Sequence, residues 1–241
     1  MLSKNELKYI QSLCQKKQRT QEGLFLAEGP KLAMELLNSN YHVEKFYATG
    51  EWLAENSVEI DVTEVSEIEL SKMSTLQTPN EVLVVCRQKK ELESPIFKDK
   101  LSIVLDGLQD PGNMGTIIRI ADWFGIDQII ASEDTVELYN PKVIQSTMGS
   151  FIRVKCWYQH LPDVLSLVNL PVYGALLKGQ SINKTASLKE GLLIIGNESK
   201  GIREEVMPYI TKAITIPRIG HAESLNAAVA TGIILSNLCS K

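Results

Sequence analysis

From residue 101 onward, unbroken apolar runs alternate with helix-type patterns, and this alternation limits the fold more than any other feature of the chain. Runs such as 101–108, 127–132 and 191–197 have no polar face, so a sheet built from them must be covered on both sides. The pattern predicts an α/β fold with a parallel sheet. The expected strands are 101–108, 127–132, 152–157, 172–178, 191–197 and 212–217, and the expected helices are 114–124, 141–149, from about 201, and 224–238.

A smaller α/β unit is expected ahead of this sheet. The charged stretch 87–100 carries one proline and separates two apolar strands, so we place a domain boundary near residue 98, giving domains 1–98 and 99–241. With 241 residues and 44% hydrophobic residues, the chain is long enough for two modest cores. The expected elements of the first unit are helices 30–39 and 67–75 and strands 43–49 and 81–86.

The net charge of −4 conceals a strong local asymmetry. Residues 1–31 carry six basic and three acidic residues, whereas residues 41–70 carry eight acidic residues and one lysine. Local field matters more than total charge for binding a polyanion, so Lys16, Lys17 and Arg19 are candidate residues for binding a polyanion such as a nucleic acid. A solvated helix face explains the same cluster equally well.

Composition argues against several other classes of protein. The four cysteines lie far apart without a Cys-x-x-Cys pair, so we expect neither a zinc site nor a disulfide framework. No apolar run reaches the ~18 residues of a membrane span, and we expect a cytoplasmic protein.

The first of three unusual joints reads LDGLQDPGNMGTIIRIADWFG, residues 105–125. Glycines, a proline and an asparagine connect a strand to a helix, and Asn113 is placed to cap that helix. Arg119 lies off the apolar stripe of the helix. An ion pair with Asp122 or Asp110 is the structural explanation for this arginine.

The second and third joints also follow apolar strands. In LLIIGNESKGI, Glu198 lies between Gly196 and Gly201, where its carboxylate could cap a helix or accept hydrogen bonds from a ligand. In the third joint, 214–235, Ser224 is placed to cap a helix and Asn226 to lie in its first turn. A buried helix that merely closes the core is the alternative explanation for this last segment.

The usual nucleotide-binding and nucleophile motifs are missing from these joints. The chain contains no G-x-G-x-x-G with a downstream acid, no P-loop and no G-x-S-x-G. Chemistry without a metal, a catalytic cysteine or a serine triad indicates a cofactor that carries its own reactivity.

Together, the three joints resemble the motifs of the SpoU, or TrmH-like, family of RNA ribose 2′-O-methyltransferases in the SPOUT superfamily. The N-terminal segment, SLCQKKQRTQEGLFLAEGPKLAMELL, is similar to the L30-like substrate-binding domain found ahead of many such catalytic domains. Arg218 departs from the family, since many members have methionine there, and Ala227 and Ala228 replace a common valine–serine pair. The motif residues are Asn113, Gly115 and Arg119 in the first joint, Gly196, Asn197, Glu198 and Gly201 in the second, and Pro217, Gly220, Ser224, Leu225 and Asn226 in the third.

The resemblance implies a trefoil knot that binds S-adenosylmethionine, and a homodimer formed through the C-terminal domain. It implies methyl transfer to a ribose 2′-hydroxyl of RNA, with ribosomal RNA favoured over transfer RNA, and no metal. Arg119 would take the proton or, remaining charged, stabilise the developing alkoxide. Asn113, Glu198, Ser224 and Asn226 would complete the catalytic site, and Leu176, Gly196, Ile216 and Leu225 would hold the cofactor.

Two other functions remain open at this point. The chain could be a nucleotide-dependent enzyme of ordinary Rossmann type, in which case it would bind a nicotinamide cofactor more tightly than S-adenosylmethionine. It could also be a non-catalytic RNA-binding module, although such a module would not need Arg119, Glu198 and Asn226 together.

Overall fold

The computed structural model describes residues 2–89 and 93–239. Among these, two compact units are distinguished by their internal contacts. The first comprises residues 2–89 together with 139–152, and the second comprises 93–138 and 153–239. The boundary near residue 98 stays a prediction.

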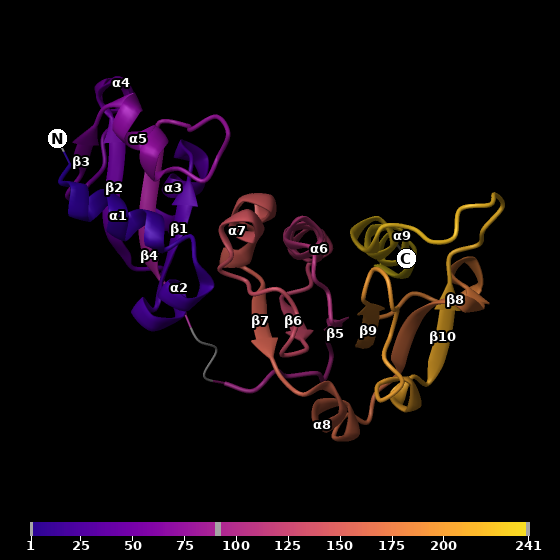
Figure 1. Ribbon diagram of the computed structural model, residues 1–241. Coiled ribbons are helices and arrows are strands. Elements are labelled where there is room, and N and C mark those ends of the chain that lie inside the picture. The colour runs from indigo at the N-terminus through magenta and orange to yellow at the C-terminus, as the bar shows by residue number, and fades with distance from the viewer. Residues whose placement is uncertain (1, 90–92, 240–241) are drawn as a thin grey trace. The chain divides into compact units, whose positions relative to one another are not determined.

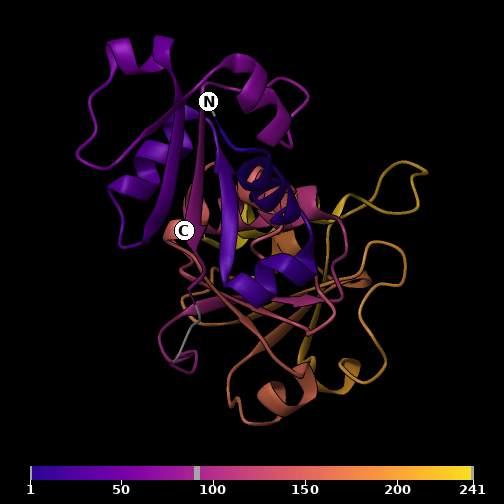
Figure 2. The same cartoon turned by 60° about the vertical axis from the view of Figure 1, so that its left-hand side comes forward.

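The first unit is built on a four-stranded sheet with the order β1-β4-β2-β3. Strand β4 pairs antiparallel with β1 and β2, and β2 pairs parallel with β3 (Figure 1, Figure 2). Apolar side chains from the strands and from α1 and α5 form its core, among them Ile10, Leu26, Tyr47 and Leu83. The elements are α1 (Lys4–Ser12), α2 (Lys16–Glu22), β1 (Leu24–Glu28), α3 (Pro30–Leu37), β2 (Val43–Thr49), α4 (Gly50–Glu55), β3 (Thr63–Val65), α5 (Glu67–Met73), β4 (Val82–Arg87), α7 (Pro141–Thr147) and η1 (Ser150–Ile152).

Arg19 is buried inside the first unit and is not part of a basic surface. Its side chain is 1% exposed. Its Nη1 donates to the carbonyl oxygens of Leu13, at 2.9 Å, and Cys14, at 2.6 Å, just beyond the end of α1. Sequence reasoning placed Arg19 in an RNA-binding patch, and the structure corrects this, because a buried guanidinium cannot reach a phosphate. Lys16 and Lys17 remain exposed on α2.

The second unit holds a six-stranded sheet in the order β10-β8-β9-β5-β6-β7, and every pair in it is parallel. This confirms the α/β class and the parallel sheet. The elements are β5 (Leu101–Asp106), α6 (Pro111–Trp123), β6 (Gln128–Ala131), β7 (Lys155–Tyr158), α8 (Leu161–Ser166), β8 (Val172–Ser181), η2 (Ile182–Lys184), β9 (Gly191–Gly196), η3 (Met207–Tyr209), β10 (Lys212–Thr215) and α9 (Ala227–Cys239).

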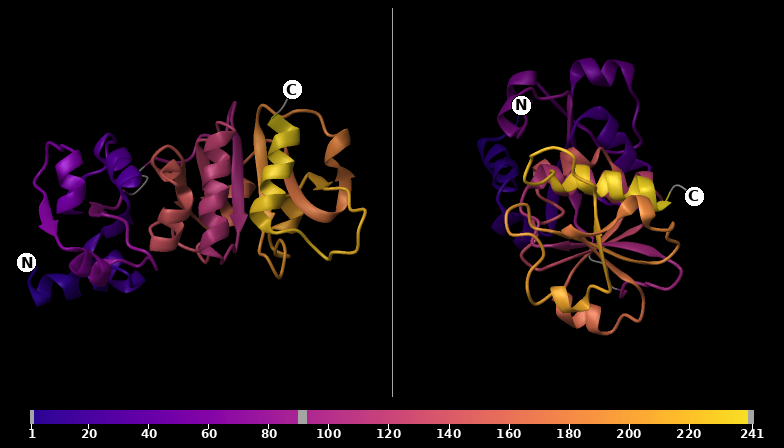
Figure 3. Two further views of the ribbon diagram at one scale, coloured as in Figure 1. Left: turned by 90° about the horizontal axis from the view of Figure 1, so that it is seen from above. Right: turned by 90° about the vertical axis from the view of Figure 1, so that its right-hand side faces the viewer.

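Both faces of this sheet are covered, as its apolar strands require. Helices α6 and α9 pack against each other on one face, and α8 lies on the other (Figure 1, Figure 3). The α8 side has a core that includes Val104, Leu165, Ile194 and Val206. None of the described helices is long and apolar enough to cross a membrane.

Three helix predictions differ from the structure in detail. The segment after Gly201 forms turns and the short η3, because Pro208 interrupts any longer helix. Helix α6 is capped by Asp110, whose carboxylate accepts from the backbone N–H of Asn113 at 2.7 Å, so Asn113 is free for another role. Helix α9 begins at Ala227, and Asn226, not Ser224, accepts hydrogen bonds from its first turn.

Replacing Arg19 by methionine should destabilise the first unit. The change leaves two carbonyl oxygens at the α1–α2 joint without their donor, so we expect the free energy of unfolding to fall by about 2 kcal/mol. Urea unfolding followed by circular dichroism measures this loss. Lys17→Met, on the exposed side of the same helix, is the matched control and should stay within about 0.5 kcal/mol of the wild type. Equal midpoints for the two variants would contradict the structural role of Arg19.

Candidate active site

The three joints meet at one edge of the parallel sheet. They follow β5, β9 and β10, and the carboxyl ends of parallel strands lie at the same edge. Strands β5 and β9 are direct neighbours, with Asp106 opposite Gly196 at the last pair of the ladder. The segments that follow them are therefore adjacent.

Glu198 connects the first two joints through its carboxylate. Its Oε1 accepts from the side-chain amide of Asn113 at 3.1 Å and from the backbone N–H of Asp110 at 3.2 Å, and its Oε2 accepts from the backbone N–H of Gln109 at 3.4 Å. Asn226 then joins the third joint, because its amide donates to Oδ1 of Asn113 at 2.7 Å. Three of the predicted catalytic residues, Asn113, Glu198 and Asn226, thus form one continuous network.

This network determines the charge of Glu198. Partial burial acts to raise the pKa of the carboxyl group, but hydrogen bonds from the Asn113 side chain and from backbone N–H groups outweigh it. The pKa of Glu198 therefore lies below its ordinary value, and the group is ionised at neutral pH. A carboxylate of this kind is a weak base, and its position suits it to orient donors.

A second set of contacts, which sequence reasoning missed, holds the same loops. Asp106 is fully buried at the end of β5 and accepts from the backbone N–H of Arg203 at 2.7 Å and from its Nε at 2.5 Å. The Asn197 amide donates to the carbonyl oxygen of Gly107 at 2.6 Å. The signal for Asp106 was present, since a carboxylate that ends a fully apolar strand must find a partner.

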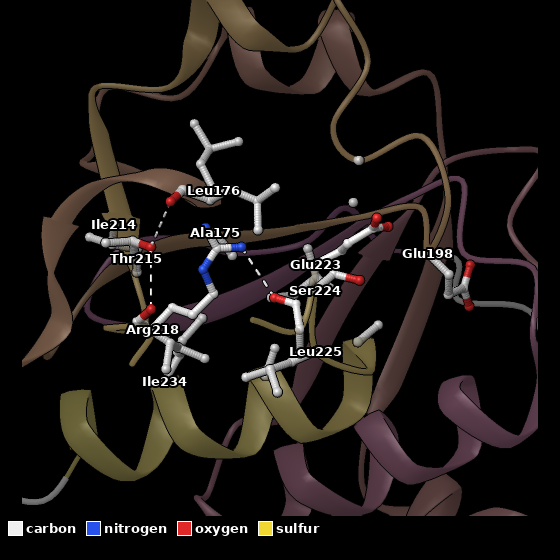
Figure 4. A pocket seen from close by; sticks show the side chains of 18 of the residues that line it. Ala175, Leu176, Glu198, Ile214, Thr215, Arg218, Glu223, Ser224, Leu225 and Ile234 are labelled. Carbon is white, nitrogen blue, oxygen red and sulfur yellow. Dashed lines mark hydrogen bonds between the residues drawn. The ribbon is translucent and has the colours of Figure 1, made fainter. Parts of the chain in front are cut away.

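A cavity of about 640 Å³ opens beside the network and is lined from β8, β9, β10, α9 and the loops after β9 and β10 (Figure 4). All four residues expected to hold the cofactor, Leu176, Gly196, Ile216 and Leu225, line it, as do Glu198 and Ser224. Its size is typical of small-molecule sites. Apolar side chains such as Leu176, Leu225 and Ile234 offer surfaces for a flat ring (Figure 4).

The sheet itself opens at this cavity. Strand β8 pairs with β9 only through residues 172–174, and its register against β10 jumps from Gly174 to Gln180. Residues 175–179 consequently have no registered ladder partner on either side, and Ala175, Leu176 and Leu177 line the cavity. Backbone groups released from a ladder need other partners. The carbonyl oxygen of Leu177 accepts from the hydroxyl of Thr215 at 3.2 Å, and the edge of a nucleobase can supply partners for its neighbours.

The backbone of Gly201 and Ile202 leaves no room for a side chain at position 196, so this position requires glycine. A Cβ at this position would lie 2.3 Å from the carbonyl carbon of Gly201 and 2.5 Å from the nitrogen of Ile202. Valine at Gly196 would therefore disrupt the turn that carries Glu198. A loss of cofactor binding in that variant could not be separated from a distorted loop.

Arg119 lies apart from the network. Its side chain is exposed on α6, is not among the residues that line the cavity, and makes no hydrogen bond or ion pair with any residue in the described ranges. Arg119 therefore does not form the ion pair with Asp122 or Asp110 that the sequence suggested. Asp122 binds Arg153 through two nitrogens, and Asp110 caps α6. Within one chain, Ser224 reaches the cavity and Arg119 does not.

Comparisons with known proteins match both parts of the chain. Residues 100–236 match the SpoU rRNA Methylase family, and residues 4–84 match the MRM3-like substrate binding domain. The chain is 32% identical to the 23S rRNA (guanosine(2553)-2′-O)-methyltransferase RlmP of Bacillus subtilis, over 92% of this chain and 91% of that protein.

Two solved structures share the whole fold. A proposed RNA methyltransferase of the TrmH family from Porphyromonas gingivalis is 36% identical, with a TM-score of 0.88 over 100% of this chain and 99% of the other. An AdoMet-bound rRNA methyltransferase from Sinorhizobium meliloti is 29% identical, with a TM-score of 0.86 over 99% of this chain and 95% of the other.

The low pKa of Glu198 predicts a specific pH dependence. A depressed pKa in the folded state stabilises the protein above the ordinary carboxyl pKa of 4.5, and this contribution disappears as the pH falls through the folded value. The free energy of unfolding of Glu198→Gln should therefore fall less steeply below pH 4.5 than that of the wild type. Chemical denaturation at a series of pH values measures the slopes. Glu204→Gln, a change at an exposed residue of the same loop, is the control and should keep the wild-type slope. If Glu198→Gln also kept the wild-type slope, this account of Glu198 would be wrong.

Proposed function

The chain belongs to the SpoU rRNA methylase family, and we propose that it transfers a methyl group from S-adenosylmethionine to a ribose 2′-hydroxyl of RNA. The observation that carries this proposal is the network of Glu198, Asn113 and Asn226, which joins three loops beside a cavity of cofactor size. Ribosomal RNA is the favoured substrate, since RlmP acts on 23S rRNA. A transfer RNA substrate and a non-catalytic RNA-binding module are the alternatives.

The cavity fits S-adenosylmethionine by size and by the chemistry of its lining. Leu176, Ile216 and Leu225 supply apolar surface for the adenosyl group, and the backbone of Ala175 and Leu176, which have no registered ladder partner, supplies donors and acceptors for the base. Gly196, which lines the cavity, gives room to the backbone of Gly201 and Ile202, so the turn that carries Glu198 can close. When bound, the cofactor supplies an activated methyl group on its sulfonium.

The residues of this chain would handle the acceptor ribose. Its 2′-oxygen must lose a proton, and two roles for Arg119 remain: proton acceptor, or fixed charge that stabilises the alkoxide. Glu198, already ionised and hydrogen-bonded, braces Asn113, which in turn orients Asn226. The Ser224 hydroxyl lines the cavity and can position the ribose.

A homodimer formed through α6 and α9 is part of the proposal. The two helices pack together, and their outer sides leave Trp123 84%, Val229 51% and Ile233 40% exposed. Contiguous exposed apolar side chains can form an association surface, whereas singly exposed ones are common. Arg119 lies one helical turn before Trp123, so a dimer over this surface would enclose it. We also propose the trefoil knot, which membership of the SpoU family supports.

The first unit would bind the RNA substrate, with Lys16 and Lys17 as its exposed cations on α2. Phosphate contacts of this type make affinity depend on salt. The proposal places the protein in the cytoplasm, together with its RNA.

Replacing Arg119 by alanine tests the chemistry. The side chain makes no contact that the fold needs, so folding and binding of S-adenosylhomocysteine should match the wild type. Single-turnover transfer of labelled methyl groups to ribosomal RNA, with 2′-O-methyl nucleosides identified after digestion, should slow by at least ~10². Arg119→Lys keeps the charge without the planar fork, so its rate separates simple charge from specific geometry. Wild-type transfer in the alanine variant would refute the role of Arg119.

Replacing Trp123 by aspartate tests the dimer. A carboxylate at the centre of an apolar interface is costly to desolvate, so the variant should be monomeric at concentrations where the wild type is dimeric. Sedimentation velocity measures the mass. Leu167→Asp, an equally exposed apolar residue after α8, is the matched control and should stay dimeric. A wild-type monomer, or a dimer that survives Trp123→Asp, would rule out this surface.

A further inference from the structure

Arg218 places a positive charge inside the cofactor cavity. It follows Pro217 in the loop after β10, and both residues line the cavity. In Figure 4 its guanidinium points into the cavity, with Ala175 and Leu176 of β8 on one side and Glu223 and Ser224 on the other. Its Nη1 donates to the carbonyl oxygen of Ala222 at 3.1 Å, which folds the side chain back over its own loop.

The charge of this guanidinium is not neutralised. Across the described ranges, no carboxylate lies within ion-pair distance of Arg218, and its single hydrogen bond is to a neutral carbonyl. Glu198, on the same cavity, is committed to Asn113 and to backbone N–H groups. An arginine keeps four of its five N–H donors available when only one is used, and its planar fork matches a carboxylate.

The cofactor brings one anionic group to this cavity. S-Adenosylmethionine ends in an amino acid, whose α-carboxylate is negative and whose α-ammonium is positive. Apolar lining from Leu176, Leu225 and Ile234 suits the adenosyl group, so a polar position is needed for the other end. Arg218 supplies a cation at this cavity, and Glu223 of the same loop supplies an anion (Figure 4).

We propose that Arg218 binds the α-carboxylate of the cofactor's amino-acid end. This rests on the proposed cofactor and deepens it, because it assigns the recognition of that carboxylate to Arg218, a variable position between the motif residues Pro217 and Gly220. Lys200 is the other cation that lines the cavity, and an RNA phosphate is the other anion that could approach Arg218. Both are distinguished by the test.

Calorimetric binding of two unreactive ligands tests the proposal without any enzymatic turnover. S-Adenosylhomocysteine carries the carboxylate, and its decarboxylated analogue lacks it. Arg218→Met keeps a side chain of similar reach without the charge and should weaken S-adenosylhomocysteine binding about tenfold. The same change should alter binding of the decarboxylated analogue less than about twofold, because its partner group is already missing.

Two further variants serve as comparisons. Lys178→Met removes a positive charge from an exposed position of β8 outside the cavity lining, and should leave both affinities unchanged. Lys200→Met removes the other cation of the lining and should not weaken S-adenosylhomocysteine binding selectively.

Each contrary result has a distinct meaning. Equal weakening of both ligands by Arg218→Met, or a carboxylate-dependent loss in Lys200→Met alone, would overturn the assignment. Unchanged affinity for both ligands would also overturn it, and weaker binding of Arg218→Met to ribosomal RNA in a filter-binding assay would then place Arg218 on the RNA surface. If the wild-type protein bound neither ligand, the proposed cofactor itself would be wrong, and that failure is visible before any variant is made.

Discussion

The hydrogen bonds around Glu198 are the contacts on which the site depends. One carboxylate accepts from Asn113 and from two backbone N–H groups of the first joint, and Asn113 accepts from Asn226 of the third. Each loop alone is an irregular turn at the end of a strand, yet together the three loops form one connected hydrogen-bond network. Because these donors keep Glu198 ionised, the hydrogen bonds that it accepts are charge-assisted and stronger than neutral ones, and the neutral Asn226–Asn113 bond extends the network to the third joint.

Two properties of the parallel sheet make that hydrogen-bond network possible. Strands β5 and β9 pair directly, so buried Asp106 can anchor Arg203 and hold the turn that follows Gly196. Strand β8 leaves the ladder after Gly174 and opens a cavity next to the same turn. A rigid parallel core thereby supports a site made of loops, which is where parallel sheets place their ligands.

Sequence patterns predicted all six strands of the second unit, since an unbroken apolar run such as 191–196 is typical of a strand buried on both faces. They missed β1 and β3 of the first unit, which are short. They failed where tertiary contacts decide the conformation. Pro208 and the anchoring of Arg203 to Asp106 replace the helix expected after Gly201 with turns. Arg19 looked like a surface cation because its carbonyl partners come from the adjacent helix end, which composition does not reveal. The opening of β8 depends on pairing register, which is equally hidden in one sequence.

The most direct measurement is a map of 2′-O-methylated nucleotides in the total RNA of cells with and without this gene. The account predicts that at least one ribosomal 2′-O-methyl group disappears in the deletion strain and returns when the gene is restored. Identical maps of ribosomal and transfer RNA in the two strains would contradict it.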